Sequence, residues 1–140
     1  MKTIWTCPRC GRKFNQRNKQ HTCARFPLEG HFKGKEAVVE QIYAQICQVV
    51  HEIGPADACP LKSRIVLQSE TPFAAVVTHR HNLDMYLWLK RQASHPRLLR
   101  TEMGIFRDYG HIFRLEKSSD LDPALIQLIQ EAYALASQSM

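Results

Sequence analysis

The strongest periodic pattern in the chain lies between Glu36 and Ile53, where apolar residues recur at intervals of three and four positions. This spacing is typical of a helix with one buried face. Gly54 and Pro55 follow directly, so we expect the helix to end there, with the glycine in a left-handed conformation. Cys47 falls beside the apolar stripe and is expected to be a small buried hydrophobe.

Alternating patterns begin after a loop that contains Asp57 and Pro60. Three strand-like runs, 63–70, 73–79 and 82–91, are joined by links of only a few residues, which predicts antiparallel hairpins. In the third run Leu83, Met85, Leu87 and Leu89 alternate with Asp84, Tyr86, Trp88 and Lys90. We expect the leucine side of this strand to face the helices.

The rest of the chain is expected to add one strand and one helix. Residues 95–103 favour a short helix or turn, and residues 110–117 a fourth strand. Asp122 in the N-cap position, with Pro123 first in the helix, predicts the start of the last helix. The sequence therefore predicts an α+β fold, with a single antiparallel sheet of about four strands and two long helices on one face.

Four candidate metal ligands precede this domain. Cys7 and Cys10 form a Cys-x2-Cys turn, and His21 and Cys23 add an imidazole and a third thiolate. Tetrahedral zinc prefers such ligands, and a complete set of four protein ligands leaves no open position for water. We therefore expect one structural Zn²⁺ in a small zinc finger.

The boundary between the finger and the α+β domain is expected near Pro27, within a connector of large apolar residues that also contains two glycines. Residues 1–26 are then the finger and residues 27–140 the α+β domain. The odd number of cysteines, five, and the lack of a signal peptide argue against disulfides and favour the cytoplasm. No apolar run approaches the roughly 20 residues that cross a bilayer, so no membrane partner is expected.

The formal net charge is +6, which is consistent with a nucleic acid or another polyanion as a partner. The excess is concentrated before Glu29, the first acidic residue. The candidate phosphate contacts of the finger are Arg9, Arg12, Lys13, Arg17 and Lys19.

Several stretches resemble a known family. They are Leu28-Glu-Gly-His-Phe-Lys-Gly-Lys35 before the first helix, Asn82-Leu-Asp-Met-Tyr-Leu-Trp-Leu89, and Tyr109-Gly-His-Ile-Phe-Arg-Leu115 before Leu121-Asp122. In these the chain is similar to the bacterial and archaeal family called domain of unknown function 5655, from about Phe26 onward. Some members resemble this chain in carrying a cysteine-rich finger, and others are fused to nuclease-like modules. The resemblance implies nucleic acid as a partner and carries no catalytic signature.

The side of the third strand that faces away from the leucines is a candidate binding surface. Tyr86, Trp88 and Lys90 are expected there, joined by Arg64 from the first strand. Aromatic and cationic side chains on a sheet face stack unpaired bases and neutralise phosphates in several small α+β domains. The alternatives are that the chain itself covers these rings, or that they form a dimer interface.

A second candidate is a cluster of histidines and cations that could meet at one end of the sheet. Its members are Arg80, His95, Arg97, Tyr109 and His111. Such a cluster could hold a phosphate or supply a general acid and base. The sequence contains no phosphate loop, nucleophile elbow or metal-binding nuclease motif beside it.

The sequence thus supports a small basic zinc-finger protein that is a nucleic-acid-binding accessory module. The alternative is a protein–protein interaction module that docks a partner or forms a homodimer. A metal-independent phosphodiesterase built on the histidine cluster is a distant third, and we expect binding rather than catalysis.

Overall fold

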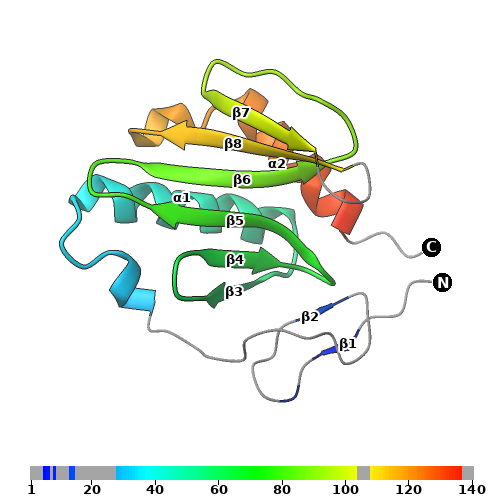
Figure 1. Cartoon of the computed structure of the whole chain (residues 1–140), viewed down its shortest axis with the longest axis horizontal. Helices are drawn as coiled ribbons and strands as arrows, with labels where there is room; N and C mark the ends of the chain where they lie inside the picture. Colours follow the sequence, from blue (N-terminus) through cyan, green and yellow to red (C-terminus); the bar gives the residue numbers. More distant parts are fainter. Residues whose placement is uncertain (1–4, 7, 9–12, 15–27, 104–107, 137–140) are drawn as a thin grey trace.

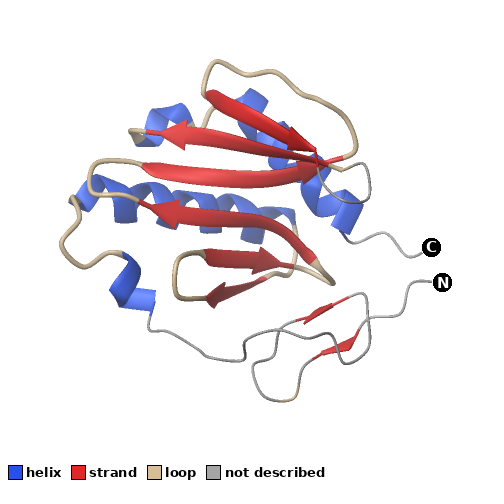
Figure 2. Ribbon diagram, in the orientation of Figure 1, coloured by secondary structure: helices blue, strands red, loops and turns tan. Residues whose placement is uncertain are grey.

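The computed structural model of the protein describes residues 5–6, 8, 13–14, 28–103 and 108–136. Its main feature is an antiparallel sheet of six strands in the order β3-β4-β5-β6-β8-β7 (Figure 1). The strands are β3 (Asp57–Pro60), β4 (Ile65–Gln68), β5 (Pro72–Thr78), β6 (Leu83–Leu89), β7 (Leu98–Met103) and β8 (Tyr109–Leu115). The two long helices both lie behind this sheet, which confirms the α+β class (Figure 2).

The first helix, α1 (Ala37–Ile53), follows the predicted periodicity. Its buried positions are Val39, Ile42, Tyr43, Ile46 and Val50. The prediction that Gly54 adopts a left-handed conformation after the helix is wrong, because its backbone is extended, with φ of 171°. A Cβ atom on Gly54 would overlap the hydroxyl of Tyr133 and lie 2.9 Å from its Cζ, so a larger residue here would have to displace the end of the Tyr133 side chain.

The second helix, α2 (Pro123–Ala136), begins at the predicted residue. The carboxylate of Asp122 accepts a hydrogen bond from the backbone N–H of Leu125, at 2.9 Å, which is the geometry of an N-cap. Two short 3-10 helices, η1 (Leu28–His31) and η2 (Ser118–Asp120), precede α1 and α2 respectively.

Strand β6 is the centre of the core. Its residues Leu83, Met85, Leu87 and Leu89 are fully buried, and they belong to one apolar cluster with residues of both helices. Tyr86 and Trp88 are only half-buried. The predicted division of this strand into a core side and an outer side is therefore confirmed.

The predicted number of about four strands is wrong, because β3 and β7 were missed. β3 includes Pro60, which weakens a strand pattern, but β3 is an edge strand and tolerates proline there. β7 lies in the segment expected to be a helix or turn, since Leu98-Leu-Arg-Thr-Glu-Met103 lacks a clear alternation. Its antiparallel pairing with β8, the next strand along the chain, makes it a strand.

A separate two-stranded ladder is formed by β1 (Trp5–Thr6) and β2 (Lys13–Phe14), in which Trp5 pairs with Phe14. The predicted ligands Cys7 and Cys10 fall between these strands in the sequence. All four predicted zinc ligands, however, lie outside the described residues. Within the described part of the chain, no helix has the length and apolar character of a membrane span.

Candidate functional site

The outer face of the sheet, opposite the helices, brings Arg64 and Tyr86 together. The guanidinium carbon of Arg64 lies 5.3 Å from the centre of the Tyr86 ring, which is a cation–π contact. Arg64 precedes β4 and Tyr86 is in β6, so the arginine reaches across β5. The residue of β5 beside Tyr86 is Ala75, whose small side chain leaves room for this crossing.

Trp88 follows on the same side of β6, two residues beyond Tyr86. It pairs with Gly110 of β8. A Cβ atom at Gly110 would lie 3.6 Å from the indole nitrogen, so the indole is in close reach of the glycine backbone. Because Gly110 has no side chain, Trp88 can lie flat toward the sheet and still keep part of its ring in solvent.

The cations of this outer face differ in their partners. Lys90 forms an ion pair with Asp108 at 2.5 Å, and Arg114 forms two hydrogen bonds with Asp84, at 2.8 and 3.0 Å. Arg64, by contrast, forms no ion pair within the described residues. Within the part of the chain that the structure describes, the side-chain contact of Arg64 is with the Tyr86 ring.

The Asp84 carboxylate is the shared partner of Arg114 and His79 at the end of the outer face near the β5–β6 turn. It is buried and accepts hydrogen bonds from Arg114 and, at 3.0 Å, from His79. Burial alone would raise the pKa of Asp84, but the hydrogen bonds and charges of Arg114 and His79 outweigh it and lower the pKa. Asp84 thus remains ionised and holds β6, β8 and the β5–β6 turn together.

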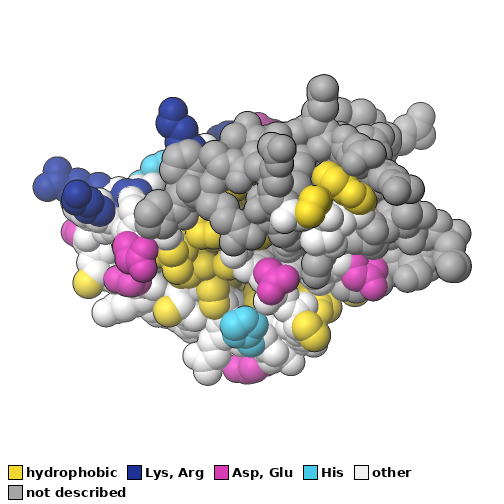
Figure 3. All heavy atoms as spheres, turned by 90° about the horizontal axis from the view of Figure 1, so that it is seen from below, with side chains coloured by type: hydrophobic (Ala, Val, Ile, Leu, Met, Phe, Trp, Pro, Cys, Tyr) yellow, Lys and Arg dark blue, Asp and Glu magenta, His cyan; other side chains and the backbone are white. Residues whose placement is uncertain are grey.

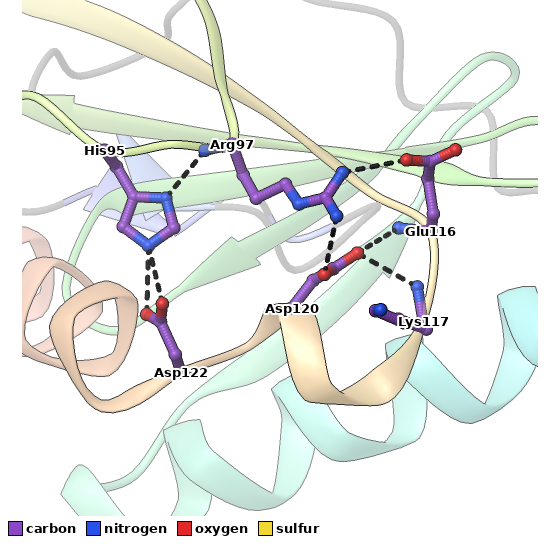
Figure 4. Close-up of polar contacts among 6 residues, drawn as sticks. All are labelled: His95, Arg97, Glu116, Lys117, Asp120 and Asp122. Atoms are coloured by element: carbon purple, nitrogen blue, oxygen red, sulfur yellow. Dashed lines mark hydrogen bonds and ion pairs between the residues drawn. The ribbon is translucent and has the colours of Figure 1, made fainter.

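His95 belongs to a polar network at the start of β7 (Figure 4). The backbone N–H of Arg97 donates to Nδ1 of His95 at 3.0 Å, so that nitrogen carries no proton and Nε2 does. Nε2 in turn donates to the carboxylate of Asp122 at 2.9 Å. The His95 side chain is 2% exposed, so both of its nitrogens are used inside the fold.

Arg97 joins the same end of the sheet to η2. Its guanidinium contacts Glu116 at 2.8 Å and Asp120 at 3.0 Å. Asp120 also accepts hydrogen bonds from the backbone N–H groups of Glu116 and Lys117 (Figure 4). With these partners in place, Arg97 closes the turn between β8 and α2.

His111 is fully buried on the helix side of β8. Its Nε2 accepts from the N–H of Ala93 at 2.9 Å, and its Nδ1 donates to the carbonyl of Tyr109 at 3.0 Å. The ring stacks on Phe113, with centroids 6.2 Å apart. His111 is therefore a satisfied core residue.

The predicted anion cluster is not brought together as one site. Tyr109 pairs with Leu89 at one end of β8, whereas His95 and Arg97 bond with residues beyond Leu115, at the other end. Arg80 is exposed in the β5–β6 turn, where its carbonyl accepts from the N–H of Glu36 at 2.9 Å.

Sequence reasoning gave no individual role to His31 and Lys35, which anchor the segment before α1. Nε2 of His31 lies 2.7 Å from the carbonyl of Leu61, and the Lys35 ammonium donates to the His31 carbonyl at 2.7 Å and to Thr78. Burial lowers the pKa of Lys35. In the sequence, these two residues stand four positions apart directly before the first helix, and this spacing could have indicated that they act together.

A groove of about 710 Å³ runs along α1 and η1. Its apolar part includes Leu28, Phe32, Tyr43 and Cys47, and Glu29, Glu40, Glu52 and His51 surround it. Seen from below in Figure 3, apolar side chains lie between acidic ones in this region. Burial raises the pKa of the Cys47 thiol, which argues against a thiolate nucleophile at neutral pH.

The candidate residues of the finger cannot be placed in the same way. Arg9, Arg12, Arg17 and Lys19 lie outside the described residues, and Lys13 is described only as part of β2. Among the described residues, no group of three or more potential ligands could hold a metal ion.

The fold and its surface define an α+β protein whose helix-free sheet face carries aromatic and cationic side chains. The family described as "Domain of unknown function (DUF5655)" matches residues 28–136, and the chain belongs to this family. No curated protein and no solved structure matches the chain.

Proposed function

We propose that the protein binds single-stranded nucleic acid through the outer face of its sheet. The observation that carries the proposal is Arg64, which has no acidic partner among the described residues and lies over the half-buried ring of Tyr86. A guanidinium held in this way can pair with a phosphate, and the adjacent rings can stack on bases.

The spacing of the two rings suits successive bases. Tyr86 and Trp88 are two residues apart on one strand, a separation of about 6.7 Å. That distance lets Trp88 stack on one base while the next stacks on the Arg64 guanidinium that covers Tyr86, when the bases are unstacked, as in single strands. Stacking of one base on an aromatic side chain contributes roughly 1–3 kcal/mol and does not require a particular sequence.

The proposal is one of binding rather than catalysis. His95 and His111, the two histidines that would have to transfer protons, use both ring nitrogens within the fold. A base or acid engaged in this way would first have to lose a structural hydrogen bond.

We extend the proposal to the N-terminal residues, where Cys7, Cys10, His21 and Cys23 would hold one structural Zn²⁺. The chemistry of the set supports this, since three thiolates and one imidazole complete a tetrahedral zinc site. The antiparallel pair β1–β2 flanks the Cys7–Cys10 stretch, as expected for a turn that offers two thiolates. The basic residues of the finger would add phosphate contacts.

The test is a fluorescence-anisotropy titration of the full, zinc-loaded chain with labelled single-stranded and double-stranded DNA and RNA at several salt concentrations. We expect tighter binding to single strands, and a salt slope that falls by about 0.7 in Arg64→Gln, as for the loss of one phosphate contact. Arg91→Gln is the matched control, because Arg91 is exposed and pairs with Glu131 of α2, on the helix side of the sheet.

Trp88 gives a second, independent readout. The chain has two tryptophans, so Trp5→Phe leaves Trp88 as the sole indole reporter. Stacking should quench its emission in step with the anisotropy change, and Trp88→Ala should weaken binding about 5- to 100-fold. Equal affinities of Arg64→Gln, Trp88→Ala and the wild type, with unchanged thermal unfolding, would refute this surface as the binding site.

A further inference from the structure

The free edge of β7 is the most exposed apolar feature of the described residues. The exposed large hydrophobic residues of the described part of the chain, Leu99 and Met103, both lie on this strand. Their exposed fractions are 46% and 69%. β7 is the last strand of the sheet, and among the described strands it pairs with β8 alone (Figure 1). Alternate backbone N–H and C=O groups of an edge strand point away from its sheet and can accept a further strand.

The charges of β7 are arranged symmetrically about Thr101. Arg100 precedes it and Glu102 follows it. The two form an ion pair with each other along the strand, at 3.3 Å, and their side chains are 53% and 56% exposed. Both lie on the outer face, since Arg100 pairs with Ile112 and Glu102 with Gly110. Met103 follows Glu102 in the regular ladder, whereas Leu99 lies at an irregularity of the ladder between Leu98 and Arg100. The strand therefore reads apolar, basic, Thr101, acidic, apolar.

We propose that β7 pairs antiparallel with β7 of a second copy of the chain, with Thr101 opposite Thr101 on a two-fold axis. This register sets Arg100 opposite Glu102 of the partner subunit, twice by symmetry, so that the exposed ion pair within each strand is exchanged for ion pairs between the subunits. Opposite charges directly across an antiparallel ladder stabilise it. The resulting sheet would be continuous through both subunits.

The other symmetric registers are disfavoured by charge. A register centred on Arg100 places two guanidinium groups directly opposite each other, and one centred on Glu102 does the same with two carboxylates. Registers shifted by one residue would oppose side chains from different faces of the pleated sheet. The choice of a second copy as the occupant thus rests on the self-complementary charges of the strand.

In Figure 1 the connector of residues 90–97 passes beyond β7. Its contacts show whether it is attached to the sheet edge or to the helices behind the sheet. Arg91 pairs with Glu131 of α2, Ala93 donates to His111 on the helix side, and His95 bonds to Asp122. These contacts fasten the connector to the helix layer. In the described part of the chain, no strand pairs with the free edge of β7.

This pairing is independent of the proposed nucleic-acid site, but it would affect how that site is used. A two-fold axis perpendicular to the sheet keeps both outer faces on the same side. The Tyr86 and Trp88 surfaces of the two subunits would then form one longer platform.

The experiment is analytical ultracentrifugation of the full chain in reducing buffer over a range of concentrations. The wild type should approach twice 16.2 kDa as the concentration rises. Glu102→Arg and Arg100→Glu, which place like charges opposite each other at two positions, should each weaken the dimer at least about ten-fold. An equimolar mixture of these two variants restores opposite charges and should form the heterodimer.

The double variant Arg100→Glu/Glu102→Arg should also dimerise, because the exchange preserves self-complementarity. Glu52→Arg, an equivalent charge change on the exposed side of α1, is the control and should leave the dimer intact. A wild type that stays at 16.2 kDa at every concentration overturns the proposal. So does a wild-type dimer that Glu102→Arg does not weaken, because another surface would then hold it.

Discussion

Nε2 of His95 lies 2.9 Å from Oδ1 of Asp122, and the same carboxylate oxygen accepts the N–H of Leu125. One acidic side chain thereby connects the start of β7 to the first turn of α2. The two bonds explain why the pKa of Asp122 is lowered, with the hydrogen bond from His95 as the main cause. They also give His95 a role in stability.

His95→Ala should lower the free energy of unfolding by about 2–4 kcal/mol, because it removes two hydrogen bonds and the edge contact with Phe113. Urea denaturation followed by circular dichroism measures this loss. His95→Gln, which keeps a donor near Asp122, should lose less. A phosphodiesterase role would instead require that His95→Ala fold as well as the wild type and lose turnover.

Asp84→Asn should destabilise the protein at pH 7 by about 1–3 kcal/mol, since it removes the charge that Arg114 and His79 contact. The pKa of Asp84 is lower in the folded state than in the unfolded state. Its contribution is therefore fully present above the unfolded pKa of about 3.9 and is lost as the pH falls through the folded pKa.

The difference in the free energy of unfolding between the wild type and Asp84→Asn should accordingly disappear below about pH 4. Denaturation curves at pH 7, 5, 4 and 3 test this, with Glu29→Gln in η1 as an exposed control. If this difference in unfolding free energy were the same at every pH, Asp84 would stabilise the fold through its packing and hydrogen bonds and not through its charge.

Gly54→Ala should destabilise the protein by about 1–3 kcal/mol, because the new methyl group overlaps Tyr133. The backbone itself is extended and adds no strain, so the cost comes from this contact. Tyr133→Ala removes the overlapping ring and, separately, the hydrogen bond to the Pro55 carbonyl. In a double-mutant cycle, Gly54→Ala should then cost little in the Tyr133→Ala background. Additive effects would contradict the proposed overlap.

Removal of zinc should affect the finger and spare the α+β domain. Mass spectrometry of metals should find one zinc per chain, which Cys7→Ser loses and Cys59→Ser, in β3, retains. The buried apolar cluster of the domain begins at Val39, and Leu28 is the first residue packed against it. The thermal transition of the domain should therefore persist in EDTA while residues 1–26 become sensitive to protease. One zinc per chain in Cys7→Ser would refute the ligand set.

Elements with a strong local pattern could be predicted, and the others could not. The helix from Ala37 to Ile53, the leucine side of β6 and the start of α2 at Pro123 all follow from periodicity or capping. β7 has helix-forming residues and no alternation, and it is a strand because it pairs with β8. Its own residues carry no strand signal, so its identity depended on the pairing with the strand that follows it.

The candidate site divides in the same way. The sequence placed Tyr86 and Trp88 on the side away from the core, since side chains alternate along a strand. Only the tertiary structure decided that Arg64 reaches Tyr86 across Ala75, that Lys90 and Arg114 are paired with carboxylates, and that His95 and His111 serve the fold. Local patterns fix which face a residue occupies, whereas its partner depends on the order in which distant strands assemble.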